Sequence, residues 1–278
     1  MQVVVTKHHG LGNDFLVLET AQFLADTGFD PAKINWPSIA REWCNRQDGI
    51  GADGLLLLSR RGDFKLGMQL YNQDGSRAEM SGNGIRCLAQ AAFNLDGFDE
   101  PVTYMVTTDA GERAVDVQVT SVDEVNVSVD MGPIEIISEP DNWASIGSDP
   151  NRPVMHLSVG NPHSVVGVED VALVNLLEIG LKVPQVNLEI VEAGPENNAI
   201  TMRVHERGAG ITQACGTGAV ASAWAASKWG LVPGSVREII VHQPGGDSIA
   251  RLNHPKLGHV TLIGPAHFSS RHNLEIVL

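Results

Sequence analysis

Gln213-Ala214-Cys215-Gly216-Thr217-Gly218 precedes an alanine-rich run, and the same pattern occurs a second time in the chain. Met80-Ser81-Gly82-Asn83-Gly84 also places a small nucleophilic side chain before Gly-x-Gly and a helix-like run. Glu206 lies nine residues before Cys215, and Asn72 lies nine residues before Ser81. Two similar half-chains, each with a polar turn at a helix start, predict one site in the cleft between them.

A second pair of loops repeats in the same way, since Gly12-Asn13-Asp14-Phe15 resembles Gly160-Asn161-Pro162-His163. Apolar periodicity predicts helices at 37–44, after Ser81 as far as Gly97, at 173–179, and after Cys215 as far as Gly230. Strands are expected at 3–7, 15–18, 55–58, 64–71, 102–106, 113–119, 125–131, 154–159, 164–168, 188–191, 199–204, 239–243, 249–252, 259–263 and 274–278. The pattern indicates a strand-rich α+β protein with one long helix per half under a curved sheet.

The length of 278 residues favours two domains, and the composition marks a boundary near Val122 only weakly. A formal net charge of −14 argues against nucleic acid or an anionic membrane as partner. The N-terminus lacks the basic flank and apolar core of a signal peptide. Three cysteines without paired spacing are typical of a reducing cytosol. We therefore expect a soluble, acidic, cytoplasmic protein.

Cys215 before Gly-x-Gly is suited to acid–base chemistry on an anionic substrate. Glycines let backbone N–H groups converge, and a helix start adds about half a positive charge, which favours a carboxylate. The same environment is expected to favour the thiolate, because helix N-termini lower a thiol pKa from about 8.5 to roughly 3.5–7.5. A glycine-capped turn around a buried cysteine is the structural alternative for one copy, but two matched copies favour a site. Removal of a proton beside a carboxylate fits this arrangement.

Other reactive residues are expected to be structural. Cys44 and Cys87 fall on apolar helix faces and are predicted to be core residues. No lysine lies in a pyridoxal-type motif, and no spacing typical of a metal site occurs. His8-His9 and the pair His254 and His259 lack a third partner in the sequence, so we expect no metal and no cofactor.

Five blocks, in order along the chain, resemble the diaminopimelate epimerase family: His9–Phe15, Asn72–Ser76, Gly82–Cys87, Gly160–His163 and Glu206–Gly218. The resemblance implies two similar strand-rich, barrel-like α/β halves, each around a central helix, related by pseudo-two-fold symmetry with the active site in the cleft between them. It implies domains of 1–122 with 266–278, and 123–265. The implied activity is cofactor-free interconversion of LL- and meso-diaminopimelate in lysine and peptidoglycan synthesis, by an enzyme that is often a homodimer.

Matching the family pattern position by position implies a set of site residues. Cys215 corresponds to the second catalytic cysteine, and His163 to a histidine near the catalytic pair. Glu206 and Arg207 correspond to the residues that read the far amino and carboxyl groups of the substrate. The remaining implied contacts are the amides of Asn13, Asn72, Asn161 and Asn187, and the carboxylate cradle of Gly82, Asn83, Gly216 and Thr217. A glutamine that some relatives use is replaced here by Gly54.

Ser81 departs from the family pattern, which has a cysteine at this position. Ionising a thiol at pH 7 costs about 2 kcal/mol, whereas ionising a hydroxyl with the pKa of water costs on the order of 12 kcal/mol. A helix start offsets at most about 2 kcal/mol of this. Ser81 therefore needs a neighbour such as His163 to take its proton, or it replaces a natural cysteine.

Three hypotheses follow from these residues. The first is a diaminopimelate epimerase whose second acid–base group is Ser81. The second is a Ser/Cys relative that acts as a dehydratase or racemase on another amino acid, against which the Glu206-Arg207 pair argues. The third is a non-catalytic amino-acid-binding protein. Exchange of the substrate α-proton with solvent separates the first from the third.

Overall fold

The computed structural model describes residues 1–147 and 149–276, and contacts between residues divide the chain into two units. The first unit contains residues 1–129 and the segment from Pro265 onward, and the second contains residues 130–264. Two strands run across these boundaries, β8 (Glu124–Pro133) and β17 (His259–Glu275). No helix among the described residues is long and apolar enough to cross a membrane.

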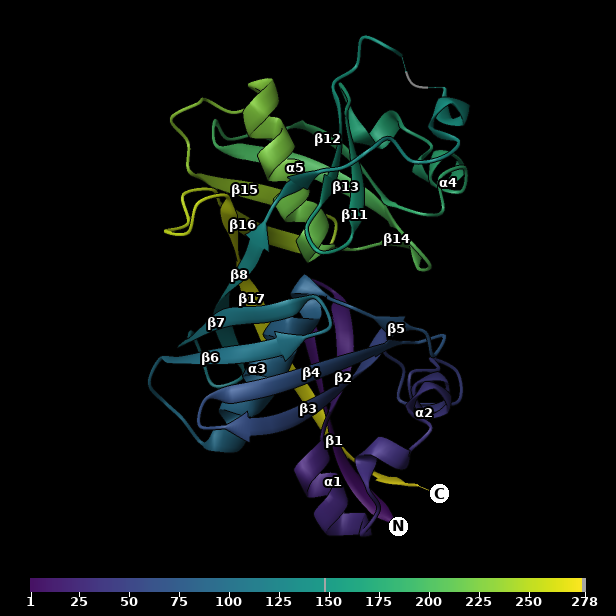
Figure 1. Cartoon of the computed structure of the whole chain (residues 1–278), viewed down its shortest axis with the longest axis vertical. Coiled ribbons are helices and arrows are strands. Elements are labelled where there is room, and N and C mark those ends of the chain that lie inside the picture. Colours follow the sequence, from purple (N-terminus) through teal and green to yellow (C-terminus); the bar gives the residue numbers. More distant parts are fainter. Residues whose placement is uncertain (148, 277–278) are drawn as a thin grey trace. The chain divides into compact units, whose positions relative to one another are not determined.

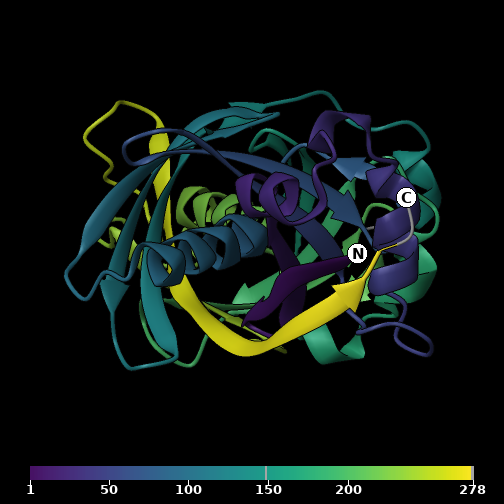
Figure 2. The same cartoon turned by 90° about the horizontal axis from the view of Figure 1, so that it is seen from below.

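In the first unit, a closed ring of strands surrounds α3 (Gly82–Asp96) (Figures 1 and 2). The order is β17–β1–β2–β3–β4–β6–β7–β8, and β8 pairs again with β17. Strand β2 pairs with β3 and β4 with β6 in parallel, whereas β1–β17, β1–β2, β3–β4, β6–β7 and β7–β8 are antiparallel. The bounds are β1 (Gln2–Gly10), β2 (Asn13–Glu19), β3 (Gly54–Gly62), β4 (Lys65–Asn72), β5 (Arg77–Ala78), β6 (Val102–Thr108), β7 (Gly111–Val119), α1 (Thr20–Thr27), η1 (Pro31–Lys33) and α2 (Trp36–Trp43).

The second unit repeats this pairing around α5 (Gly216–Trp229). β10–β11 is antiparallel, β11–β12 parallel, β12–β13 antiparallel, β13–β15 parallel and β15–β16 antiparallel, which is the succession that runs from β1 to β7. The bounds are β9 (Glu135–Ile136), β10 (Val154–Ser158), β11 (Pro162–Gly167), β12 (Asn187–Ala193), β13 (Ala199–Glu206), β14 (Gly210–Thr212), β15 (Glu238–Gln243), β16 (Gly246–Arg251), η2 (Trp143–Ile146), η3 (Val171–Leu173) and α4 (Leu176–Gly180). The prediction of two similar strand-rich halves, each around a helix, is confirmed.

Both central helices are buried almost all round, as a helix inside a ring of strands must be. Every residue of α3 from Gly82 to Phe93 is buried, and small residues let α5 fit its own ring. Gly97 and Gly230 end the two helices in the left-handed conformation, with φ of 67° and 75°. Most of α3 is apolar, so its buried Asn83, Arg86 and Gln90 need polar partners.

Several elements differ from the sequence prediction. Helix α1 was not expected, and the helix predicted at 173–179 is the short pair η3 and α4, because Asp170 and Asn175 each cap a separate turn. The predicted strands 259–263 and 274–278 belong to one strand, β17, with residues 277 and 278 outside the described residues. Strand β4 is mostly buried rather than half exposed, since it lies between β3 and β6.

Candidate active site

Ser81 and Cys215 are the N-caps of α3 and α5, in closely similar backbone conformations. Ser81 has φ −141° and ψ 122°, and Cys215 has φ −126° and ψ 115°. Gly84 N donates to Ser81 Oγ at 3.0 Å, and Gly218 N donates to Cys215 Sγ at 3.4 Å. Each side chain thus satisfies a first-turn N–H group that has no partner within its helix.

Cys215 lies in a buried and acidic environment, which corrects one prediction. Burial raises the pKa of its thiol well above the ordinary value, and the nearby carboxylates of Glu206 and Glu189 raise it further. Hydrogen bonds from Gly218 N and Thr217 Oγ1, both at 3.4 Å, act in the opposite direction. Burial and the two carboxylates raise the pKa of the thiol more than the helix start lowers it, so the thiol is protonated at neutral pH. The prediction of a thiolate is therefore wrong for this structure.

Glu206 is the acidic group next to this thiol. Its carboxylate, at the end of β13, accepts hydrogen bonds from Thr212 and Cys215. Burial raises the pKa of Glu206, and the negative charge of Glu189 adds to this rise. A carboxylate with a raised pKa is a better proton acceptor at neutral pH, so Glu206 is suited to exchange a proton with the thiol.

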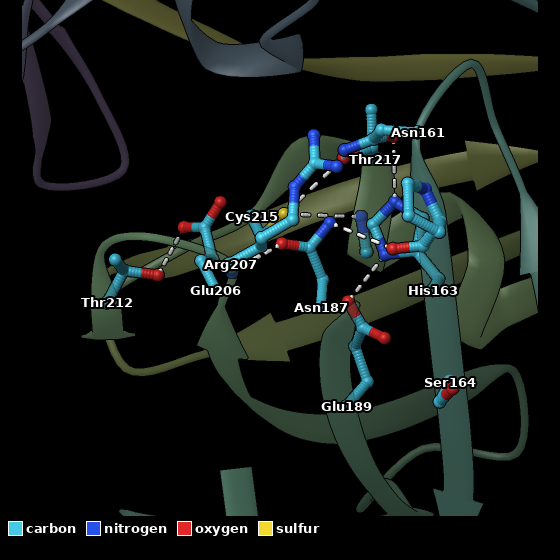
Figure 3. A network of polar contacts seen from close by, with 12 residues as sticks. Asn161, His163, Ser164, Asn187, Glu189, Glu206, Arg207, Thr212, Cys215 and Thr217 are labelled. Carbon is cyan, nitrogen blue, oxygen red and sulfur yellow. Dashed lines mark hydrogen bonds and ion pairs between the residues drawn. The ribbon is translucent and has the colours of Figure 1, made fainter. Parts of the chain in front are cut away.

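A chain of side-chain contacts connects Cys215 to a buried histidine and acid (Figure 3). Thr217 Oγ1 accepts from Asn161 Nδ2 at 3.4 Å, and Asn161 Oδ1 lies 2.9 Å from His163 Nε2. His163 Nδ1 lies 2.7 Å from Glu189 Oε1, and both side chains are fully buried. Both ring nitrogens therefore lie at hydrogen-bond distance from oxygen atoms, which fixes the orientation of the ring between Asn161 and Glu189.

Asn187 joins two of the predicted loops. Its Nδ2 donates to Pro162 O at 3.1 Å, and its Oδ1 accepts from Arg207 N at 2.9 Å. Asn187 is buried at the start of β12, whereas Arg207 is exposed in the turn directly after β13. The amide thus fixes the loop before His163 relative to the turn that carries Glu206 and Arg207 (Figure 3).

The first unit places its predicted residues around the start of α3. Asn83 Nδ2 donates to Asn13 Oδ1 at 3.2 Å, and Asn13 Nδ2 donates to Asp53 Oδ2 at 2.5 Å. The Asn13 loop turns through Leu11 and Gly12, both with positive φ. Asn72 instead stabilises the turn that follows it, because its Nδ2 donates to Ser76 Oγ at 3.0 Å.

A larger side chain at Gly54, such as the glutamine that the family resemblance implies, would require local movement. A Cβ atom at this position would lie 2.8 Å from Tyr71 O and 3.0 Å from a Leu70 methyl group. Gly54 pairs with Phe15 on one side and Asn72 on the other, so the strands approach closely here.

The other two cysteines are core residues, as predicted. Cys44 and Cys87 are 0% exposed, and burial raises the pKa of each thiol to about 12. Neither thiol is ionised at neutral pH, and all three cysteines are free. Among the cysteines, Cys215 alone lies at a helix start.

His254 and His259 do have a third partner, contrary to the sequence prediction. Asp130 Oδ1 lies 2.8 Å from His259 Nδ1, and Asp130 Oδ2 lies 3.7 Å from His254 Nε2. Lys256 N donates to His254 Nδ1 at 3.0 Å, so this ring nitrogen acts as an acceptor. Lys256 Nζ also lies 3.4 Å from Asp130, so a cation already compensates this carboxylate.

Two buried residues near the predicted site were missed. Glu189 is the fully buried one of two acids in β12, and Arg86 is the single base within α3. An isolated charge in an otherwise buried element is the signal that could have identified both, because such charges are seldom fully buried without a partner.

Comparison with known proteins gives a consistent result over nearly the whole chain. The family model described as diaminopimelate epimerase matches residues 5–137 and 155–268. A diaminopimelate epimerase of Thermosynechococcus vestitus is 38% identical, with 96% of this chain and 97% of that protein covered. One from Desulfitobacterium hafniense is 34% identical, with 95% of each chain covered.

Solved structures share the fold at much lower identity. A predicted epimerase from Pseudomonas aeruginosa has a TM-score of 0.76 at 16% identity, and covers 99% of this chain and 100% of that chain. A hydroxyproline epimerase from Agrobacterium vitis has a TM-score of 0.68 at 15% identity, with 98% and 91% covered. At this identity the likeness concerns the fold alone.

Proposed function

Because the chain belongs to the diaminopimelate epimerase family, we propose that it interconverts LL- and meso-2,6-diaminopimelate by removing and returning one α-proton. The reaction serves lysine and peptidoglycan precursor synthesis and is independent of pyridoxal phosphate. Relatives with this name are 34–38% identical over about 95% of the chain, which favours this activity over a dehydratase or a non-catalytic binding protein.

Cys215 is the proposed acid–base group on one side of the reacting carbon. The observation that supports it is the position of Cys215 as the N-cap of α5, with its thiol hydrogen-bonded to Glu206, and the raised pKa of Glu206 suits this carboxylate to accept a proton. The thiol gives its proton to the carbanion in one direction of the reaction. In the other direction Glu206 takes the thiol proton, and the resulting thiolate removes the α-proton.

Ser81 is the proposed group for the opposite side of the carbon. It holds the same N-cap position as Cys215, but its hydroxyl is far harder to ionise, so we expect this step to limit turnover. His163, which would assist, has both ring nitrogens engaged by Glu189 and Asn161 in the structure. The proposed substrate contacts remain Asn13, Asn72, Gly82, Asn83, Asn161, Asn187, Glu206, Arg207, Gly216 and Thr217.

Exchange of the α-proton in heavy water tests the function. Each stereoisomer of diaminopimelate is incubated with the wild type, Ser81→Cys and Cys215→Ala, and deuterium incorporation and isomer composition are followed by NMR and chromatography. We expect slow exchange by the wild type, a large gain in turnover for Ser81→Cys, and no exchange for Cys215→Ala. Absence of exchange from every isomer with both wild type and Ser81→Cys would rule the proposal out.

We also propose that the protein is a cytoplasmic homodimer. The support is the family resemblance and the three free, buried cysteines, which are typical of a reducing compartment. Analytical ultracentrifugation tests the oligomeric state, and a monomer at micromolar concentration would contradict it. Fractionation of cells that produce the protein tests the compartment.

A further inference from the structure

Asp53, the residue directly before β3, contacts the side-chain amide of Asn13. Asn13 Nδ2 donates to Asp53 Oδ2 at 2.5 Å, and Asp14 N donates to the same oxygen at 2.9 Å. Arg46 Nη2 donates to the other carboxylate oxygen, Oδ1, at 2.7 Å. The backbones are joined at the same point, because Asp53 N donates to Asp14 O at 2.8 Å. The Asn13 amide therefore has a charged acceptor that is itself held in place, and hydrogen bonds to charged acceptors are the stronger kind.

Asn13 is also the first of two amides that connect Asp53 to a buried cation. Asn83 Nδ2 donates to Asn13 Oδ1 at 3.2 Å, and Arg86 Nη2 donates to Asn83 Oδ1 at 2.8 Å. Asn83 and Arg86 are 1% and 0% exposed. Burial lowers the pKa of Arg86 to about 10, so the guanidinium is charged at neutral pH. Three hydrogen bonds thus run in one direction, from a guanidinium through two amides to a carboxylate.

The chemistry of the two ends fixes the direction of this chain of hydrogen bonds. A guanidinium has only donors and an ionised carboxylate has only acceptors, whereas an amide has both. If the Asn83 amide turned over, its NH2 group would face Arg86. If the Asn13 amide turned over, its oxygen would face Asp53. Either change loses a hydrogen bond to a charged group, so the two ends hold both amides in a single orientation.

The internal repeat shows that the fold does not require the two charged ends. Asp53 directly precedes β3, which is parallel to β2, and Val186 directly precedes β12, which is parallel to β11. Arg86 lies five residues after the N-cap of α3, and Val220 lies five residues after the N-cap of α5. The second unit therefore has valine at both matching positions, with exposures of 3% and 0%. The charged ends are present together in one unit and absent together from the other.

The second unit orients its matching asparagine by other residues. Asn161 corresponds to Asn13, and its Oδ1 lies 2.9 Å from Nε2 of His163. His163 occupies the position that Phe15 has in the first unit, and its Nδ1 lies 2.7 Å from Glu189 Oε1. Each unit thus holds its loop asparagine by polar side chains, which lie at different positions of the repeat. What the two units share is the fixed amide.

We propose that Asp53 and Arg86 are positioning residues that set the orientation in which the amides of Asn13 and Asn83 meet the substrate. Both amides are proposed substrate contacts, so the inference rests on the proposed function and names the residues that prepare this part of the site. With either end removed, an amide can turn over. It then presents an oxygen where the substrate needs an N–H group, or the reverse.

Calorimetric binding of meso-diaminopimelate to Asp53→Val, Asn13→Ala and the double variant tests the proposal. Asp53→Val introduces the residue that the second unit has at this position. We expect it to weaken binding about 10- to 100-fold, the effect of losing a hydrogen bond to a charged group. In a protein that already carries Asn13→Ala, the same substitution should weaken binding by no more than about twofold, because Asp53 acts through that amide.

Asp14→Asn is the matched control. Asp14 belongs to the same charged cluster, where its carboxylate lies 2.7 Å from Arg46 Nη2 and 2.8 Å from Lys7 Nζ. This variant should bind within about twofold of wild type. A loss from Asp53→Val that is equally large with and without Asn13→Ala would mean a merely structural role and would overturn the proposal. An unchanged affinity of Asp53→Val would overturn it as well.

The side-chain amide of Asn13 provides a second measurement that needs no substrate. In protein labelled with ¹⁵N-asparagine, a proton on Asn13 Nδ2 should resonate downfield because it is bound to a carboxylate, and Asn13→Ala assigns this signal. Asp53→Val should move the signal toward the position of a solvated amide. If Asp53→Val does not fold, Asp53→Asn replaces it in both measurements, with smaller changes in the same direction. An Asn13 signal that stays in place in the variant contradicts the proposal.

The proposed function fails in a different way. A wild type that neither binds diaminopimelate nor exchanges its α-proton contradicts the function itself. A wild type that does both, with Asp53→Val equally tight in binding, contradicts only the role of Asp53 and Arg86.

Discussion

His163 Nδ1 lies 2.7 Å from Glu189 Oε1, and neither side chain is exposed to solvent. The parallel register of β11 and β12 brings them together, because His163 pairs with Asn187, two residues before Glu189. Glu189 Oε2 has no hydrogen-bond partner, so the contact of Oε1 with His163 is the main polar contact of this buried side chain. Through Asn161 and Thr217 the pair is also connected to the Cys215 thiol.

Glu189→Gln is expected to lower kcat about 10- to 100-fold, a part of what a well-placed acid–base group contributes. The amide replaces the carboxylate that contacts His163 Nδ1, and it removes one of the charges that raise the pKa of Cys215. Steady-state kinetics should show little change in KM. Glu178→Gln on the exposed surface of α4 is the control, and a kcat loss of similar size there would contradict the prediction.

Alkylation of Cys215 should be slow at neutral pH, because the raised pKa keeps the thiol protonated. The rate with iodoacetamide should rise only well above the pH at which an ordinary thiol ionises. Glu206→Gln should move this rise to lower pH, since it removes the larger of the two carboxylate effects. Mass spectrometry of the Cys215 peptide measures the rate, and rapid alkylation of the wild type at pH 7 would show that the thiol is ionised.

The sequence predicted the features of the site that depend on neighbouring residues. Gly-x-Gly after Ser81 and Cys215 is enough to place both side chains as N-caps, and the structure has both there. The ionisation of Cys215 depends instead on Glu206 and Glu189, which strands β13 and β12 bring to it. Local sequence gives no measure of burial or of charges from other strands, so the thiolate prediction was wrong.

Contacts between strands, which local sequence does not show, also explain why Glu189 was not predicted as a site residue. Glu189 stands between Leu188 and Ile190, so its own neighbours indicate only a buried strand. Its partner His163 comes from another strand, and the role of the pair follows from the register between them. Strand β17 was predicted as two pieces because it contacts different strands along its length, β16 near one end and β1 near the other.

Acid should destabilise the first unit through His8. This residue is 0% exposed, with Nδ1 2.9 Å from Gln90 Oε1, and burial lowers its pKa to about 4. The folded state thus binds this proton less readily than the unfolded state, with its ordinary value of 6.5. The contribution of the neutral His8 to stability is therefore present above pH 6.5 and is lost as the pH falls toward 4. The loss amounts to about 3 kcal/mol, at 1.36 kcal/mol for each unit of pKa difference.

Urea unfolding between pH 7 and 4 measures how the free energy of unfolding depends on pH, and His8→Asn should make this dependence weaker. His242 is the control because neighbouring Glu196 and Asp247 raise its pKa, which gives a dependence of opposite sign. His242→Gln should therefore leave the acid loss in place. Equal slopes in the wild type and His8→Asn would show that His8 is not its source.

Gly218→Ala should damage the second unit more than Gly84→Ala damages the first, although both glycines occupy the same helix position. A Cβ atom at Gly218 would lie 2.6 Å from Glu189 Oε1, so the buried carboxylate would have to move away from His163. A Cβ atom at Gly84 would meet nothing closer than 3.1 Å, the distance to Ser81 Cβ. We expect Gly218→Ala to cost about 1–3 kcal/mol in free energy of unfolding, typical of overpacking, and to lower kcat as Glu189→Gln does. Denaturant unfolding and kinetics of the two variants measure this difference, and equal costs would mean that Glu189 moves freely beneath α5.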